Sequence, residues 1–343
     1  MSSRLARLID LGEREILKQI IPRFASGAGD DCACLDIAAG QLVATTDPVP
    51  PPAAASIGRD EDPFWMGWLL VTINVSDIAA AGAEPLGFLA AIECEAAYST
   101  ASFERLLEGI KASCEEAGIS YVGGNLREAQ KLSAVGTAFG VCTSYKALTR
   151  VGARAGDYLI SVGQGGAFWR DALRLLTGKE LVRKGDSPVF RPISQIRLMH
   201  QLARRHLVRA AMDNSDGLLP TLNELAGRNG LGVVVDLNAL FVPNMTIEES
   251  FDSARYWLGW GDWNVIAAIS PEHKAEIDEI ARKVGTPIYH IGSFTNEYAG
   301  VLLRRGQKVA TAPRLESERF ASDSWMLKGI DEYVRLLKTV ELP

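Results

Sequence analysis

The stretch TINVSDIAAAGAEP, from Thr72 to Pro85, decides how the rest of this chain is interpreted. It lies in the most apolar part of the sequence, Met66 to Ala83, yet it contains Asn74, Ser76 and Asp77. A buried carboxylate is unfavourable unless it is paired or binds a metal ion. Asp77 is therefore expected either to cap a helix or to face a cation. The same polar residues argue against a membrane span.

The patterns around this stretch predict alternating helices and strands. The apolar run predicts a long helix from Phe64 to Ala81, preceded by a strand in QLVATTD and followed by one in GAEPLGFLAAIEC. Helical spacing of apolar residues predicts helices over 1–25 and over Ser102 to Ala117. ISYVGGN is expected to be a strand that ends in a Gly-Gly turn, and KLSAVGTAFGVC alternates as a strand does. The fold class is therefore α+β or α/β.

Length and composition indicate a two-domain globular protein. The chain has 343 residues, 47% hydrophobic and 23% charged, and a change of pattern at Tyr145 to Asp157 suggests a domain boundary. A net charge of -6 gives no general attraction to nucleic acid or to anionic membranes, so neither is expected as a partner. The N-terminal segment lacks the apolar core of a signal peptide. Five cysteines form no disulfide framework, which favours reduced thiols and a cytoplasmic location.

Acidic residues recur where apolar strands end or apolar helices begin. They are Asp30 with Asp31, Asp47, Asp77, and Asp213 with Asp216. Taken one at a time, such residues are more often helix caps and first-turn acids. Together, hard oxygen ligands from several elements suit Mg²⁺, which completes its shell with phosphate oxygens and water. The glycine-rich turns GAGDD, VGGN and GQGG would allow close approach of a phosphate-bearing ligand.

Six motifs in order resemble a known family. GDDCACL, LVATTD, VTINVSDIAAAGAEP, VGGN, ALTRVGARAGD and AMDNSDGLLPTLNELA resemble the aminoimidazole-ribonucleotide-synthetase-like (PurM-like) superfamily, most closely its thiamine-monophosphate kinase branch. The resemblance implies an α+β fold of two domains. Residues 1–147 would form an N-terminal dimerising domain that binds ATP and magnesium, and residues 148–343 a C-terminal α/β domain that completes the nucleotide site. It also implies ATP and Mg²⁺ as cofactors, a small-molecule acceptor and a homodimer.

The resemblance also assigns roles to individual residues. It implies magnesium ligands at Asp30, Asp47, Asp77, Asp213 and Asp216, with Asp216 also catalytic. It implies contacts to the nucleotide or its metal from Thr45, Thr46, Gly124, Asn125, Arg150 and Ser215. Carboxylate-held metal ions provide the positioning and charge neutralisation on which phosphoryl transfer depends.

Departures from the family pattern concern the acceptor. Asn125 stands where the kinase motif GGDTT has a metal-ligating Asp. Ala54 and Gly261 stand where the kinase has its acceptor-site His and Glu. The leading interpretation is therefore a phosphotransferase with a changed acceptor, bound near Pro48–Ser56 and Trp257–Asn264. An ATP-dependent ligase or cyclase that activates an amide or carboxylate oxygen, and an inactive nucleotide-binding partner protein, remain as alternatives.

Overall fold

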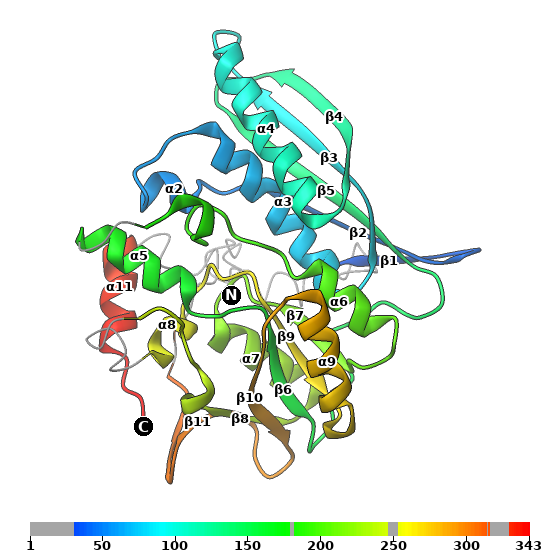
Figure 1. Ribbon diagram of the computed structural model, residues 1–343, viewed down its shortest axis with the longest axis vertical. Coiled ribbons are helices and arrows are strands. Elements are labelled where there is room, and N and C mark those ends of the chain that lie inside the picture. The colour runs from blue at the N-terminus through cyan, green and yellow to red at the C-terminus, as the bar shows by residue number, and fades with distance from the viewer. Residues whose placement is uncertain (1–30, 179–181, 246–252, 314, 316–328) are drawn as a thin grey trace, which may run out of the picture.

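The structure is a computed structural model, and it describes residues 31–178, 182–245, 253–313, 315 and 329–343. The predicted helix over 1–25 and the predicted ligand Asp30 lie outside these residues. Two sheets form the framework, one on each side of the segment 143–157 (Figure 1). No helix of the described residues has the length and apolar character that a membrane crossing requires.

The first sheet has five strands in the order β1-β2-β5-β3-β4. Only β3 and β4 pair in parallel; the other neighbours are antiparallel. Helices α3 and α4 pack on each other and cover one face of this sheet (Figure 1). The elements of this half are β1 (Ala33–Ile37), β2 (Gly40–Pro48), α2 (Ala53–Ser56), α3 (Pro63–Ala80), β3 (Glu84–Cys94), α4 (Thr100–Ala117), β4 (Ser120–Glu128) and β5 (Ser133–Cys142).

No described element covers the other face of this sheet. Along β5 the residues alternate strictly: Ala134, Ala138 and Cys142 are buried under the helices, while Val135 and Phe139 point the opposite way and are exposed or half-buried. Leu89 of β3 lies on the same open face as Val135 and Phe139, next to them in the pairing. Apolar side chains gathered on an open sheet face are typical of a protein–protein contact.

The second sheet has seven strands in the order β12-β11-β8-β10-β6-β9-β7, antiparallel except for β8 with β11. Its core and that of the first sheet meet along α3, which contacts α6, β7 and β9. The elements are β6 (Tyr158–Val162), α5 (Ala167–Thr177), η4 (Lys184–Asp186), α6 (Ile196–Ala203), β7 (Ala210–Asp213), α7 (Leu218–Asn229), β8 (Gly232–Asp236), η5 (Leu237–Ala239), α8 (Ala254–Leu258), β9 (Val265–Ile269), η7 (Pro271–His273), α9 (Lys274–Val284), β10 (Ile288–Thr295), β11 (Gly300–Arg305), β12 (Lys308–Thr311) and α11 (Ile330–Thr339).

Helix α3 forms because the sequence offers it both a start and a buried path. Asp62 accepts the N–H of Phe64 at 3.0 Å, and Pro63 occupies the first turn, where its missing N–H costs nothing. From Gly67 to Ala80 every residue is buried. The predicted helix from Phe64 to Ala81 is therefore confirmed, and α3 brings its polar residues into the interior between the two halves.

One local prediction is wrong. Gly123 and Gly124 do not end a strand in a turn but lie inside β4. A Cβ on Gly124 would lie 1.8 Å from the carbonyl oxygen of Ala90. Glycine is thus required here because β4 approaches β3 closely just beyond a register shift at Phe88 and Leu89.

Candidate active site

Three carboxylates from separate elements meet at the junction of the two halves. Asp31 precedes β1, Asp77 lies in the last turn of α3, and Asp213 ends β7. One carboxylate oxygen from each lies within 4.8 Å of the others. Oxygens this close can share one hard divalent cation, so the residues present fit Mg²⁺.

Electrostatics show that this cluster is unfavourable on its own. Burial, followed by the charges of Asp213, Asp31 and Asp47, raises the pKa of Asp77 well above its usual value. Burial and the charge of Asp31 raise the pKa of Asp213 to about 8, and Asp216 adds to the shift. Asp77 also lies at the negative end of the α3 dipole. A bound cation would offset each of these costs.

Hydrogen bonds hold the carboxylates in place. Thr45 Oγ1 donates to Asp77 Oδ2 at 2.6 Å, and Ser76 Oγ lies 3.1 Å from Asp213 Oδ2. Ser215 Oγ lies 3.3 Å from Asp213 Oδ1. Arg150 Nη2 lies 2.5 Å from Asp31 Oδ1, which places one guanidinium beside the acidic cluster.

Asn74, Ser76 and Asp77 of α3 therefore have distinct tasks. Asn74 Oδ1 accepts the backbone N–H of Asp47 at 2.9 Å, and so fixes β2 against the helix. Ser76 links α3 to Asp213 across the junction. Asp77 belongs to the acidic cluster, so the helix-cap interpretation of this residue is excluded: the cap of α3 is Asp62.

The acidic residues of the turn after β7 do not cap the helix that follows. Helix α7 begins after Gly217 without any side-chain capping bond, so Asp213 and Asp216 do not cap it. The buried amide of Asn214 anchors this turn instead: Asn214 Nδ2 donates to Asn264 Oδ1 at 2.8 Å, and Asn264 Nδ2 donates to Ser161 Oγ at 2.6 Å. Asn214 and Asn264 are at most 1% exposed, so this chain is held rigidly in the core.

Several predicted nucleotide contacts lie elsewhere in the single chain. Thr46 alternates with Thr45 along β2, and its hydroxyl faces Thr137 on the open side of the sheet. Gly124 and Asn125 are in β4, separated from β2 by two strands. The structure thus brings together Thr45, Arg150 and Ser215 with the acidic cluster, and places Thr46, Gly124 and Asn125 apart from it.

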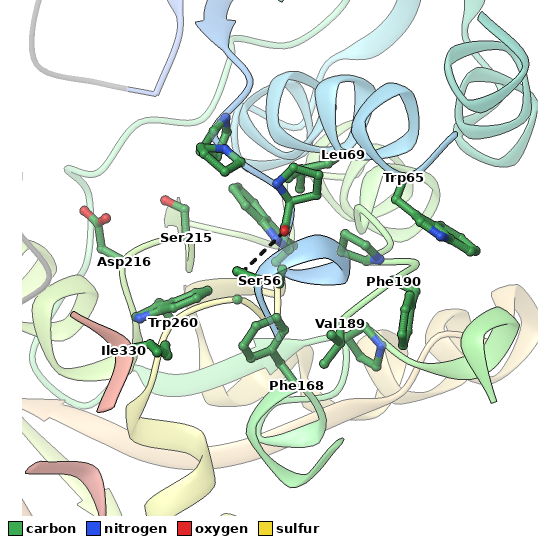
Figure 2. Close-up of a pocket in the computed structure, with 18 residues that line it drawn as sticks. Ser56, Trp65, Leu69, Phe168, Val189, Phe190, Ser215, Asp216, Trp260 and Ile330 are labelled. Atoms are coloured by element: carbon green, nitrogen blue, oxygen red, sulfur yellow. Dashed lines mark hydrogen bonds between the residues drawn. The ribbon is translucent and has the colours of Figure 1, made fainter. Parts of the chain in front are cut away.

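A cavity of about 370 Å³ opens beside the acidic turn. Ser215 and Asp216 lie together at one end, and Trp65 and Phe190 lie at the opposite end (Figure 2). The proline segment Pro50 to Pro52 and the segment Trp260 to Trp263 contribute to its walls. The expected acceptor segments therefore do line one cavity, except that Trp257 is fully buried in the core and Ala54 is buried behind the wall.

Asp262 shows why this segment holds its shape. Its carboxylate accepts the N–H of Gly166 at 2.6 Å and that of Phe168 at 2.9 Å, at the start of α5. Burial raises its pKa to about 7, although both backbone donors act in the opposite direction. The residues on either side, Gly261 and Trp263, face the cavity.

Sequence reasoning missed several site residues. Asp31 joins the acidic cluster but was not named as a ligand, while Asp30 lies outside the described residues and stays a prediction. Phe168, Phe190 and Ile330 line the cavity but carry no chemical signal that separates them from core residues. For Asp31 the acidic pair was the available signal.

Family models match both halves of the chain. The N-terminal domain model of AIR synthase related protein matches residues 29–142, and the C-terminal domain model matches residues 154–303. The chain belongs to this family. The resemblance inferred from the six motifs and the two-domain α+β, PurM-like fold are thereby confirmed.

Members of the AIR synthase related family with known names extend the comparison. A thiamine-monophosphate kinase of Methanospirillum hungatei is 29% identical over 290 residues, covering 80% of this chain and 92% of that protein. The enzyme of that name from Pyrococcus horikoshii is 27% identical and covers 94% of this chain and 98% of its own. A solved ThiL complexed with AMPPCP and TMP is 25% identical, with a TM-score of 0.73 over 89% of this chain and 98% of its own. The Escherichia coli hydrogenase maturation protein HypE, at 19% identity and a TM-score of 0.65 over 89% of this chain and 95% of its own, shares the fold.

Proposed function

We propose that this protein is an ATP- and magnesium-dependent phosphotransferase of the thiamine-monophosphate kinase type, acting on a different small-molecule acceptor. The observation that carries the proposal is the cluster of Asp31, Asp77 and Asp213, which Ser215 connects to a neighbouring cavity. Named relatives and a solved ThiL with a nucleotide analogue support the nucleotide.

In this proposal the acidic cluster holds the cation, with Asp47 and Asp216 as further ligands. A bound Mg²⁺ would neutralise charge on the transferred phosphoryl group. Arg150 balances part of the acidic charge and is in place to contact phosphate, and Ser215 presents its hydroxyl beside Asp213. Asp216 stands between the cluster and the cavity, where it can orient the acceptor and receive its proton.

The open face of the first sheet supports a homodimer. Val135, Phe139 and Leu89 form an apolar face that a second copy of the sheet would cover. Gly124 and Asn125, in the edge strand β4, are apart from the cluster of their own chain. We therefore propose that they, and Thr46 on the open face, contribute to the nucleotide site only in the assembled dimer.

The wall of the cavity supports a changed acceptor. A Cβ at Gly261 would lie 2.8 Å from the ring of Phe168, and the residue has φ +104°, so a Glu would not fit there without rearrangement. Ala54 is 1% exposed, belongs to the same buried apolar cluster as Phe190 and does not line the cavity. The surroundings of Ala54 and Gly261 therefore support the proposal of a changed acceptor.

Calorimetric titration with AMPPCP tests the proposal. We expect binding with Mg²⁺ and a much weaker signal in EDTA, and Asp77→Asn should reduce the magnesium-dependent part at least ten-fold. Glu276→Gln, which removes one negative charge from the surface of α9, is the matched control and should bind as the wild type does. Absence of nucleotide binding with any divalent ion would exclude both this proposal and the ligase alternative. Binding without phosphoryl transfer to any acceptor would favour the inactive partner protein.

A further inference from the structure

Trp263 has a backbone conformation that is unusual for a residue of its size. Its φ is +54°, in the left-handed region that glycine and asparagine adopt readily and that bulky residues avoid. Both of its neighbours are held by other parts of the fold. Asp262 accepts the N–H of Gly166 at 2.6 Å, and Asn264 accepts a hydrogen bond from Asn214 at 2.8 Å. The chain therefore cannot relax at Trp263 without breaking these contacts.

The side chain of Trp263 packs little within the protein. It is half-buried, yet it belongs to neither hydrophobic core cluster and contacts no other aromatic ring of the described residues. The nearby Trp260, in contrast, packs on Phe168 and Trp169, with ring centroids 5.0 and 5.3 Å apart. Backbone strain of this kind is concentrated at sites that bind ligands. The cavity of about 370 Å³ that Trp263 lines is therefore where a partner for its ring is expected.

Two side-chain donors in the cavity walls are available to a ligand. No atom of the described residues accepts the indole N–H of Trp263, and protein atoms do not enclose its nitrogen. The indole N–H of Trp65, by comparison, donates to Asp60 at 2.8 Å. The Ser56 hydroxyl reaches only the Pro52 carbonyl, at 3.5 Å, and Figure 2 shows it between the acidic and the far aromatic end. Because an indole can only donate and a hydroxyl can donate as well, a hydrogen-bond acceptor on the ligand suits both.

We propose that Trp263 determines which acceptor this protein binds, and that the acceptor is a flat ring system whose edge carries a hydrogen-bond-accepting ring nitrogen or carbonyl oxygen. The ring lies against the indole of Trp263, and the accepting atom receives the indole N–H or the Ser56 hydroxyl. The inference rests on the proposed function and specifies its substrate class. The group to be phosphorylated lies at the other end of the molecule, beside Ser215 and Asp216. Because the indole is already held in place, little of its freedom is lost on binding.

Two alcohols of equal shape test the accepting atom. The rings of 2-(2-naphthyl)ethanol have no accepting atom, whereas 2-(quinoxalin-6-yl)ethanol carries one nitrogen on each long edge of its ring system. The preference is the ratio of the two dissociation constants, measured by calorimetry without nucleotide. Trp263→Phe keeps a ring and removes the N–H, so the preference for the quinoxaline should fall about five-fold or more. Comparing the two probes in the two proteins cancels the difference in their hydration.

Trp65→Phe is the matched control. It also removes an indole N–H from the cavity wall, but Asp60 already accepts that N–H, so the preference should equal that of the wild type. Ser56→Ala removes the second donor and should lower the preference about three-fold. Ser56 is exposed at the last position of α2, so this variant tests the inference even if Trp263→Phe does not fold.

Thermal stability separates a ligand-binding role of Trp263 from a structural one. Glycine adopts a φ of +54° without strain, and little packing is lost with the indole. Trp263→Gly should therefore melt within about 3 °C of the wild type, while both probes bind at least about ten-fold more weakly. Trp260→Gly should melt much lower, because Trp260 packs on Phe168 and Trp169. A fall of more than about 6 °C for Trp263→Gly would show that the fold itself needs this indole and would overturn the inference.

Titration of the same samples with AMPPCP and Mg²⁺ separates the two proposals. Nucleotide binding, combined with one and the same preference in the wild type, Trp263→Phe and Ser56→Ala, would overturn the acceptor class alone. Nucleotide binding without binding of either probe would overturn it as well. A preference that depends on Trp263 without any nucleotide binding would overturn the phosphotransferase and leave the selectivity of the cavity standing.

Discussion

Replacing Asp213 by asparagine should change how the stability of the protein depends on pH. Burial and the charge of Asp31 raise the pKa of Asp213 to about 8. Because the folded state binds this proton more tightly than the unfolded chain does, stability without a divalent ion falls as pH rises from about 4 towards 8. A displacement from 3.8 to about 8 corresponds to at most about 6 kcal/mol.

The asparagine variant lacks this titration and also relieves its neighbour Asp77. In EDTA, the free energy of unfolding of the wild type should fall between pH 5 and pH 8. The fall for the variant should be smaller by at least about 2 kcal/mol. At pH 8 the variant should be the more stable of the two. Adding Mg²⁺ should reverse the order, because a ligand that binds only the folded state stabilises it.

Urea unfolding followed by tryptophan fluorescence, at pH 5, 6.5 and 8 with EDTA or Mg²⁺, provides the measurement. Glu276→Gln serves as the control for loss of one negative charge and should retain the wild-type pH dependence, since its partner Arg205 and the residue itself are about half exposed. Parallel pH profiles for Asp213→Asn and the wild type in EDTA would refute the reasoning, as would equal stabilisation of both by Mg²⁺.

Three further outcomes are expected. Asp216→Asn should lower ATP turnover about a hundred-fold with an unchanged melting temperature, and near-normal turnover would remove Asp216 from the chemistry. Gly261→Ala should cost about 1–3 kcal/mol in urea unfolding, since φ +104° and the Phe168 ring oppose a Cβ; wild-type stability would show that the wall can move. Val135→Lys, on the open face of the first sheet, should convert a dimer to a monomer in light scattering with little loss of fold, whereas a dimer that persists would place the interface elsewhere.

Local sequence patterns were sufficient to predict α3 and β5, but not the role of the Gly-Gly pair. Helix α3 was predicted because its apolar run is long, whereas its start at Asp62 and Pro63 became evident only in the structure. Strand β5 was predicted because its residues alternate between a buried and an open face. The Gly-Gly turn was predicted wrongly because a close strand approach and a turn require glycine equally, and only the pairing of β3 with β4 distinguishes them.

The site was predictable where its chemistry is unusual for its surroundings. Asp77 was recognised because a carboxylate in an apolar helix is unfavourable unless it is paired or binds a metal ion. The acidic turn 213–216 was recognised because its carboxylates also adjoin apolar segments. The role of Asp31 in the cluster was not predicted, because no periodicity specifies where its side chain points. The cavity walls could be foreseen only in part, because Phe168 and Phe190 are ordinary apolar residues until the chain folds and brings them opposite the proline segment.

Residues 260–264 combine cavity-facing residues with two buried polar ones, with a consequence for how this protein could acquire new substrates. Asp262 and Asn264 point inward, where one holds the start of α5 and the other the acidic turn through Asn214. Trp260, Gly261 and Trp263 contribute only to the cavity wall and its packing. Selection can therefore exchange the tryptophan positions while the inward-facing pair keeps the start of α5 and the acidic turn aligned. In directed evolution, libraries at 260 and 263 should yield new acceptor ranges, and libraries at 262 and 264 should yield mainly inactive proteins.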